Sequence, residues 1–288
     1  MSLPETWRPV TVPSTNADGL PIVPMTEEQK FVFDLKGWLL LPSLLTADQV
    51  TAIRAHAHQV LDDPTSVPED QRHYLGGPGQ VVLDHPVVSG ILNELLAHAT
   101  VASEDCYGFR YDHGFCMRRK NAGPDPFSPH GGSGLHSLIG NSHIYQHQWG
   151  KVHSGLTRVV WEINGAEEGQ GATMLLTGSH KVAFPRPASI TGRDSKLWES
   201  YSCPPGSVLI FTEALCHSGQ RWTNPNTDRL AFFNCYNAIC AKWAPHRVPK
   251  AVISAMHPKR QSLFRGVWTG AGEGQSVNKY IGENNLSL

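Results

Sequence analysis

The stretch that decides the fold is PGSVLIFTEALCHSGQRWTNPNTDRLAFF, residues 205–233. A Pro-Gly turn leads into the run Ser207 to Phe211, and this pattern predicts a buried strand. His217 follows this strand, and Arg229 opens the next apolar run twelve residues later (229 − 217). Because the inward side chains of neighbouring strands share one face of a sheet, we expect the imidazole and the guanidinium to reach the same space.

The second half of the chain reads as short strands separated by turns. After residue 105, clusters of Gly, Pro, Asn and Asp divide the sequence into short apolar stretches. Such punctuation is typical of antiparallel sandwiches and barrels. The segment 119–153 shows little regular pattern, which is typical of a functional loop. The expected strands are 107–118, 155–163, 172–176, 206–211 and 228–238.

The first half predicts helices instead. Thr26 and Thr46 each begin a capping box, with Gln as the third residue after the threonine, so a helix should start at both. A further helix is expected after Pro86, and Trp38 to Leu41 reads as a short buried strand. Helices first and strands second predict helices packed on one side of an antiparallel sheet.

Composition excludes several classes of protein. The net charge is -1 and charged residues are 17% of the chain, so nothing favours a nucleic acid polymer or an anionic membrane. No apolar run approaches the ~20 residues of a membrane span, and no leader opens the sequence, so we expect a cytoplasmic protein. The six cysteines form no CxxC pair, and GxSxG and phosphate-loop motifs are missing too. The oligomeric state is not indicated.

Three separated motifs together carry a family resemblance. GSHK at 178–181 follows an apolar strand, PGSVLIF follows at 205–211, and the His217–Arg229 spacing completes the set. In this order they resemble the phytanoyl-CoA dioxygenase family of iron(II)/2-oxoglutarate-dependent enzymes. EEQKFVFDLKGWLLLPSLLTADQV, residues 27–50, also resembles the opening of this family, so the resemblance covers roughly 26–240.

The resemblance implies a fold and an activity. The fold would be mostly β with flanking α: a double-stranded β-helix (jelly roll, cupin-like), with the N-terminal helices packed on one sheet. The chain would be an oxidoreductase that uses Fe(II), 2-oxoglutarate and O₂ on a small-molecule substrate. We expect a single domain over 1–288. Its parts would be an extended arm (1–25), a mainly helical support (26–104), a jelly-roll core (105–240) and a C-terminal extension (241–288).

The resemblance also assigns roles to residues. His217 would be one metal ligand, and Arg229 would hold the distal carboxylate of 2-oxoglutarate. The other ligand should precede residue 155, and the best candidate is His130, 87 residues earlier (217 − 130), in the sequence Pro-His-Gly-Gly. The same segment contains rival histidines at His136, His143, His147 and His153.

Position 132 departs from the family pattern. The family has His-x-Asp at this place, whereas the sequence has His130-Gly131-Gly132 and no His-x-Asp anywhere. In halogenases of this kind, Ala or Gly stands at this position and a halide binds iron in place of the carboxylate. The sequence therefore favours chlorination, with chloride beside Gly132, over hydroxylation by a dioxygenase of the same family. Three alternatives stay open: water fills the gap, Gly-Gly is an ordinary turn, or a remote carboxylate completes the site, from Asp112, Glu162 or Glu213. Glu213 would otherwise orient an imidazole as a second-shell partner.

Weaker candidates concern the substrate. The basic residues Arg118 to Lys120, with Lys151 and Arg158, favour an anionic small molecule, although a solvated charge run is the commoner explanation. Two other classes compete with the redox enzyme. One is a jelly-roll binding protein that has lost its iron site, and the other is a cupin-like isomerase or hydrolase without 2-oxoglutarate. The candidate substrate contacts are Asp112, His113, Arg119, His136 and Trp222.

Overall fold

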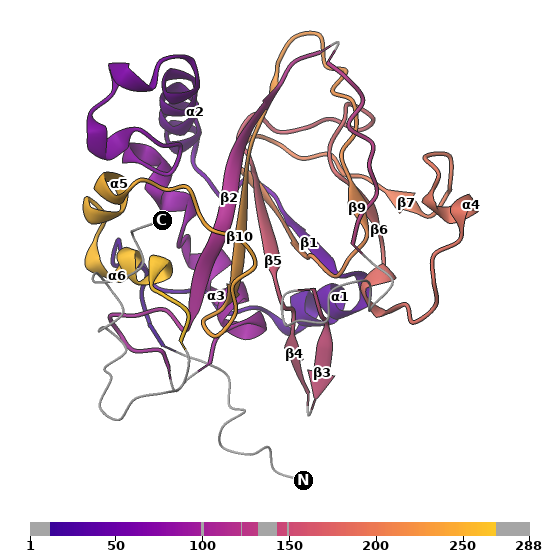
Figure 1. Ribbon diagram of the computed structural model, residues 1–288, viewed down its shortest axis with the longest axis horizontal. Helices are drawn as coiled ribbons and strands as arrows, with labels where there is room; N and C mark the ends of the chain where they lie inside the picture. Colours follow the sequence, from indigo (N-terminus) through magenta and orange to yellow (C-terminus); the bar gives the residue numbers. More distant parts are fainter. Residues whose placement is uncertain (1–11, 99–100, 122, 132–142, 149, 269–288) are drawn as a thin grey trace.

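The computed structural model describes residues 12–98, 101–121, 123–131, 143–148 and 150–268. Its centre is a five-stranded antiparallel sheet in the order β1-β8-β5-β10-β2 (Figure 1). These strands span Trp38–Leu41 (β1), Ser207–Thr212 (β8), Thr157–Glu162 (β5), Arg229–Ala238 (β10) and Phe109–Arg119 (β2).

A smaller sheet lies beside the large one. It has the order β7-β6-β9 and stands to the right of the large sheet in Figure 1. The hairpin β3–β4 projects below both sheets in the same view. In the described part of the chain the two sheets stay separate and do not close into a barrel. The bounds are Trp198–Glu199 (β7), Met174–Leu176 (β6), His217–Ser218 (β9), Gln146–Gln148 (β3) and Lys151–His153 (β4).

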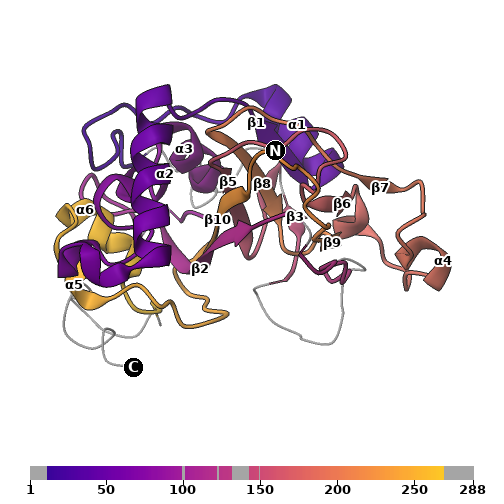
Figure 2. The same cartoon turned by 90° about the horizontal axis from the view of Figure 1, so that it is seen from above.

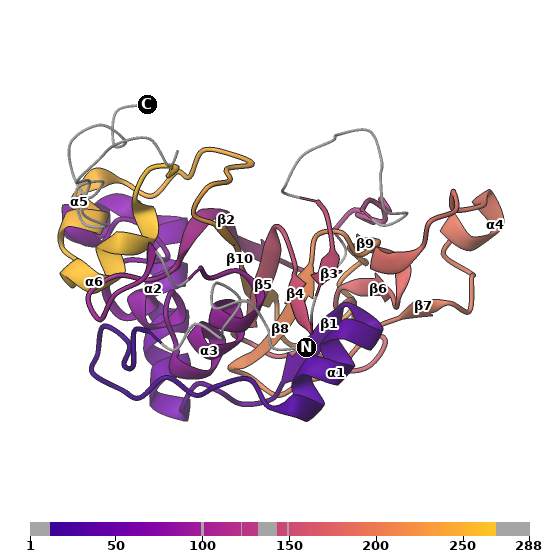
Figure 3. The ribbon, with the colours of Figure 1, turned by 90° about the horizontal axis from the view of Figure 1, so that it is seen from below.

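Helices cover the opposite face of the large sheet. Figures 1 and 2 show three layers, with α2, α3, α5 and α6 on one side, the large sheet in the middle and the small sheet on the other side. The helix α1 lies next to β1, away from the other helices that cover the sheet, as the view from below shows (Figure 3). The α-helices are Glu27–Lys36 (α1), Ala47–Asp62 (α2), Pro86–Leu95 (α3), Ala188–Thr191 (α4), Lys250–Ser254 (α5) and Pro258–Gln261 (α6). Short 3-10 helices span Pro64–Ser66, Glu69–Gln71, Gly77–Val82, Ser179–Lys181 and Ser262–Phe264.

The predicted elements are confirmed in their main lines. Both capping boxes form. The hydroxyls of Thr26 and Thr46 each accept from the backbone N–H of the Gln three residues later, and the side-chain oxygen of that Gln accepts from the backbone N–H of the threonine. The five predicted strands correspond to β2, β5, β6, β8 and β10, and the expected mostly-β fold with helices on one sheet is present. All six cysteines are free. Among the helices of the described ranges, none is long and apolar enough to cross a membrane.

Alternation along β5 shows how the large sheet divides two cores. Val159 and Trp161 point outward into the core shared with the helices, whereas Val160 points inward, toward the small sheet. Because side chains alternate between the two faces of a strand, Arg158 and Glu162 share the inward face with Val160. The inward face of the large sheet therefore carries charged side chains within an apolar core.

Buried His180, in the GSHK motif, makes stability depend on pH. Its side chain is 3% exposed, and Nε2 lies 3.2 Å from the Asp34 carbonyl. Burial lowers the pKa of His180 from 6.5 to about 4, so between these values the unfolded chain binds more protons and stability rises with pH. We expect the urea midpoint to fall between pH 6.5 and 4, and His180→Gln to remove up to about 1.4 kcal/mol per pH unit of that slope. An unchanged slope in the variant would show that His180 does not contribute.

Candidate active site

His130 and His217 face each other across a short backbone bridge. The N–H of His130 donates to the carbonyl of His217 (3.1 Å), and the N–H of His217 donates to the carbonyl of His130 (2.9 Å). Residues directly opposite in an antiparallel pair present their side chains on the same face. The two ring centroids lie 4.2 Å apart with the planes at 61°. The structure thus brings together the two imidazoles that the sequence singled out.

Backbone carbonyls fix the orientation of both rings. Nδ1 of His130 lies 2.8 Å from the Ser128 carbonyl, and Nδ1 of His217 lies 2.8 Å from the Leu215 carbonyl. A carbonyl only accepts, so we assign the proton to Nδ1 and leave Nε2 as a lone pair. Burial lowers the pKa of His217 to about 4, which keeps this ring neutral. An imidazole whose Nδ1 is held by a carbonyl in this way directs Nε2 outward and is suited to metal coordination.

Gly131 lets the two chain segments approach closely. It has φ +69°, and a Cβ at this position would lie 2.5 Å from the Leu215 carbonyl oxygen and 2.8 Å from that of Glu213. Only glycine fits both the conformation and the space. Arg186 also donates to the Gly131 carbonyl, at 3.1 Å. The next residue, Gly132, and the candidate His136 lie outside the described residues.

The carboxylate of Glu213 lies next to the ring of His217. Its Oε2 lies 3.6 Å from Nε2 of His217, and its Oε1 accepts from Nε of Arg158 at 2.5 Å. Burial disfavours the charge on Glu213, but Arg158 and then His217 outweigh it and lower the pKa to about 2. Glu213 is therefore ionised beside the imidazoles. Of the three remote carboxylates considered from the sequence, all of which lie in the described residues, Glu213 contacts the ring of His217, whereas Asp112 and Glu162 bind other partners.

The carboxylate of Asp112 accepts hydrogen bonds from the backbone of the segment that follows β10. It is fully buried, and its oxygens accept from the N–H groups of Trp243 (2.8 Å) and Ala244 (3.0 Å). Asn237 donates to it as well, at 3.3 Å, and Nδ1 of His113 lies 2.8 Å away. These contacts favour a structural hydrogen-bond role for Asp112, with His113 attached to it, over contact with a substrate.

Arg229 stands where the sequence predicted, at the start of β10, but its guanidinium is already bound. Both Nε and Nη2 donate to the carboxylate of Glu162, and Nη1 donates to the Gly171 carbonyl at 3.1 Å. Nη2 also contacts the hydroxyls of Thr173 (3.1 Å) and Tyr201 (3.2 Å). Burial opposes the charge of Arg229, but Glu162 outweighs it and raises the pKa. Arg229, the residue predicted to bind 2-oxoglutarate, is therefore already paired with a carboxylate of the protein in this structure.

Arg119 lies directly opposite Arg229 in the pairing of β2 with β10. Nη1 donates to the Gln220 carbonyl at 3.1 Å, and no ion pair of Arg119 with Asp or Glu is found in the described ranges. Partial burial and then the charge of Arg229 lower the pKa of Arg119. Its neighbour Arg118 points to the other face of the sheet, where it pairs with Asp62 at 2.5 Å.

The remaining candidates are spread over the fold. Lys151 donates to the Ala97 carbonyl, so the predicted basic residues do not form one cluster. Trp222 is 1% exposed in the core between the sheets, and its Nε1 donates to the Thr227 carbonyl at 2.6 Å. Of the rival histidines, His143 packs edge-on against Trp243, with ring centroids 4.2 Å apart, whereas His147 and His153 lie in the β3–β4 hairpin.

The family model for phytanoyl-CoA dioxygenase matches residues 33–231, more than half of the sequence. The chain belongs to the phytanoyl-CoA dioxygenase family. As a member of this family it is an enzyme of the iron(II)/2-oxoglutarate-dependent oxygenases. No match is found among curated proteins.

Solved structures share the family fold. HygX from Streptomyces hygroscopicus with iron bound is 20% identical, with a TM-score of 0.58, covering 75% of this chain and 87% of HygX. The carbocyclase SnoK from nogalamycin biosynthesis is 16% identical, with a TM-score of 0.52 and coverage of 81% and 90%. The epimerase SnoN from the same biosynthesis is 13% identical, with a TM-score of 0.51 and coverage of 76% and 83%. At these identities the likeness shows the fold alone.

The histidine pair of this dioxygenase-family enzyme fits an open iron site. Fe(II) in such enzymes takes imidazole ligands and leaves positions for 2-oxoglutarate and O₂. His130 and His217 offer two Nε2 lone pairs, each supported by a backbone carbonyl. Over the described ranges, no group of three His, Cys, Asp or Glu side chains is arranged to hold a metal ion. The described donors are thus two imidazoles, with the Glu213 carboxylate set back from them.

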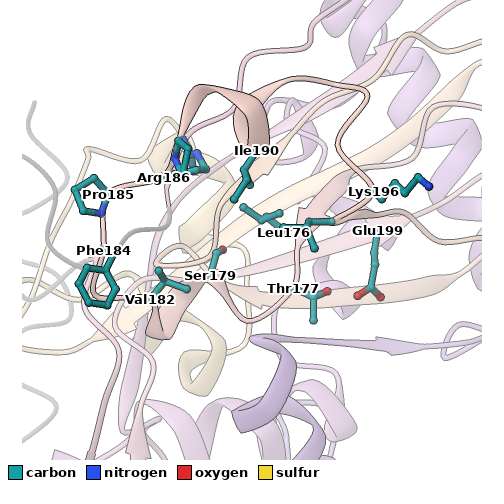
Figure 4. A pocket seen from close by; sticks show the side chains of 12 residues that line it. Leu176, Thr177, Ser179, Val182, Phe184, Pro185, Arg186, Ile190, Lys196 and Glu199 are labelled. Atoms are coloured by element: carbon teal, nitrogen blue, oxygen red, sulfur yellow. The ribbon is translucent and has the colours of Figure 1, made fainter.

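A separate cavity of about 490 Å³ lies beside β6 and the segment after it. Figure 4 shows residues of its wall, with Phe184 and Arg186 on one side, Ile190 in the middle and Glu199 on the other side. His130 and His217 do not line it. Three of its lining residues connect it to the site: Nη1 of Arg186 donates to the Gly131 carbonyl, while the N–H of Leu176 donates to the carbonyl of Cys216 and the hydroxyl of Ser179 accepts from the N–H of Cys216.

Proposed function

We propose that this enzyme uses Fe(II), 2-oxoglutarate and O₂ to functionalise a C–H bond of a small molecule, and that the reaction is a halogenation, with chloride as the favoured halide. The observation that carries the proposal is the pair of converging imidazoles at His130 and His217, combined with the missing carboxylate at Gly132. HygX has been solved with nickel, 2-oxoglutarate and hygromycin B bound, which supports a small-molecule substrate here.

The residues have distinct tasks in this proposal. His130 and His217 would hold the iron, and the carbonyls of Ser128 and Leu215, which bind Nδ1 of each ring, would leave both Nε2 atoms free to coordinate it. When bound, iron would supply O₂-dependent removal of a substrate hydrogen, coupled to conversion of 2-oxoglutarate into succinate. Glycine at 132 leaves a ligand position for a halide. The positive end of the site, at Arg229, would receive the distal carboxylate of 2-oxoglutarate.

Hydroxylation is the second candidate, and Glu213 favours it. Two donor atoms that bind one metal at about 2.1 Å and at a right angle to each other lie about 3.0 Å apart. Oε2 of Glu213 already lies 3.6 Å from Nε2 of His217. A small shift would make this carboxylate a ligand in place of the halide. Its other oxygen is held by Arg158, which opposes such a shift. We therefore favour halogenation, with Glu213 as a charged neighbour of the site.

Chloride titration separates the two candidates without knowledge of the substrate. We expect the visible charge-transfer band of the anaerobic Fe(II)–2-oxoglutarate protein to respond to chloride. In Gly132→Asp the new carboxylate should occupy the position and weaken chloride binding at least about tenfold, the cost of losing roughly 1.4 kcal/mol. The control Glu213→Gln should keep the chloride response.

The opposite pattern would establish Glu213 as the ligand. The natural protein would then be insensitive to chloride, and Glu213→Gln would gain the response. Once a substrate is known, a product that is unchanged in halide-free buffer would refute halogenation directly.

A further inference from the structure

Arg158 lies beside the proposed iron site, and the outer edge of its guanidinium, Nη1 and Nη2, is unbound. Its Nε donates to Oε1 of Glu213 at 2.5 Å, and Oε2 of the same carboxylate lies 3.6 Å from Nε2 of His217. Neither Nη1, which is buried, nor Nη2 donates to an acceptor in the part of the chain that the structure describes. The side chain as a whole is still 11% exposed. Because an unpaired cationic donor in a largely buried place is costly, this edge is suited to an acceptor that a ligand supplies.

The inward face of the large sheet carries an ion pair at each of its two ends. Arg229 and Glu162 form one pair, and Arg158 and Glu213 form the other. Arg158 is paired in register with Cys235, which lies six residues (235 − 229) along β10 from Arg229. At about 3.4 Å per residue, the two ends are roughly 20 Å apart. With the distal carboxylate of 2-oxoglutarate at Arg229, the end at Arg158 is left for the substrate.

The proposed iron ligand lies toward the Arg158 end. Phe211 is directly opposite Arg158 in the pairing of β5 with β8, and its ring centroid lies 4.7 Å from that of His217. A molecule that contacts the outer edge of Arg158 would therefore be close to the metal as well. This is the placement that a substrate of the proposed reaction requires.

An open aromatic face adjoins this arginine. Phe115 lies directly opposite Phe233 in the pairing of β2 with β10, and the two rings stack at 4.9 Å with their planes at 4°. Phe233 packs against the core between the sheets, so both rings lie on the inward face. Phe115 is nevertheless 48% exposed, and its ring centroid lies 5.9 Å from Cζ of Arg158. Such a face is suited to stacking with a planar ring of a ligand.

The charges at this end indicate which kind of oxygen fits. Arg158 and Glu213 neutralise each other, and Asp112 has Arg110 at 3.9 Å. Burial raises the pKa of the Cys235 thiol and lowers the pKa of His143, so neither carries a charge at neutral pH. A substrate carboxylate would thus lack a counter-charge of its own here. The outer edge of Arg158 matches an uncharged acceptor, such as the oxygen of a carbonyl or an amide.

We propose that the substrate is a planar ring compound with an uncharged oxygen acceptor, that the outer edge of Arg158 binds this oxygen, and that the ring stacks on Phe115. The inference names the substrate class of the proposed function and rests on it, because it places the substrate beside the metal of His130 and His217. Arg158 would then determine specificity.

A set of naphthalene probes tests the inference by binding alone. The natural protein is titrated with 2-naphthamide, with the carboxylate 2-naphthoate, and with naphthalene, which has no oxygen, and binding is followed by NMR of the probes. We expect 2-naphthamide to bind more tightly than 2-naphthoate. Arg158→Lys keeps a cation for Glu213 but removes the outer edge, so it should weaken 2-naphthamide about tenfold and leave naphthalene unchanged.

Two further variants separate the aromatic contact from binding elsewhere. Phe115→Leu should weaken both 2-naphthamide and naphthalene about fivefold, because both lose the stacked ring. Phe184→Leu alters the separate cavity of about 490 Å³ and is the matched control, which should change neither affinity. Thermal unfolding of each variant shows that it is folded. If Phe184→Leu weakens the probes and Phe115→Leu does not, they bind in the separate cavity and the inference is wrong.

The remaining outcomes decide between the inference and the proposed function. A folded Arg158→Lys protein that binds 2-naphthamide as the natural protein does, or a natural protein that prefers 2-naphthoate, would overturn the inference. Paramagnetic manganese(II), compared with zinc, should broaden the signals of the bound 2-naphthamide, since the ring would lie near the metal. A protein that binds neither metal would refute the proposed function, whereas the comparison of Arg158→Lys with the natural protein needs no metal.

Discussion

His217→Ala should abolish iron binding and the conversion of 2-oxoglutarate to succinate. The proposed site has two protein ligands, so the variant would hold the metal by His130 alone. Loss of a residue that merely supports a metal ligand costs about 10–100-fold in affinity or activity, and loss of a ligand itself should exceed about 100-fold. The measurements are metal affinity of the purified protein and succinate formation in the presence of Fe(II).

Controls distinguish this effect from a general loss of structure. His58→Ala removes an imidazole on the helical side of the large sheet, where it contacts Arg118 at 3.1 Å, and should leave iron binding unchanged. His130→Ala should behave as His217→Ala does. A folded His217→Ala protein that still binds iron and turns over 2-oxoglutarate would contradict the assignment of His217 as a ligand.

The backbone framework was predictable because its signals are local. The capping boxes at Thr26 and Thr46 depend on residues three positions apart, and both form. The run 207–211 is short and follows a turn, and it becomes the buried strand β8, between β1 and β5. The approach of His130 to His217 was inferred from a family resemblance, and the backbone bridge between them is present in the structure.

Side-chain partners distant in sequence were not predictable. Asp112 was a candidate substrate contact, but its acceptors are taken by backbone N–H groups more than 130 residues away. Glu162 was considered as an iron ligand, and it pairs with Arg229 instead, 67 residues away. One signal was available: Glu162 ends the strand TRVVWE on the inward face, where a buried carboxylate requires a cation. Nothing in the sequence indicated which arginine would supply it.

Arg229→Ala should destabilise the protein by about 3–5 kcal/mol, the range found when one partner of a buried ion pair is removed. Glu162 would remain at 0% exposure with only the Tyr201 hydroxyl and no counter-charge. Urea unfolding at pH 7 measures the loss. Arg119→Ala is the control, because its side chain is partly exposed and has no carboxylate partner in the described structure, so it should cost less than about 1 kcal/mol.

The double variant Glu162→Leu/Arg229→Leu shows which role Arg229 has. If the pair is structural, replacing both charges with apolar side chains should recover most of the lost stability, because the desolvation cost of both ions disappears with them. The proposed function places the distal carboxylate of 2-oxoglutarate on Arg229, so the stable double variant should lose at least about tenfold in affinity for 2-oxoglutarate, measured by calorimetric titration of the nickel-loaded protein. A stable double variant that binds 2-oxoglutarate as tightly as the natural protein would show that Arg229 has a structural role only and that another group holds the distal carboxylate.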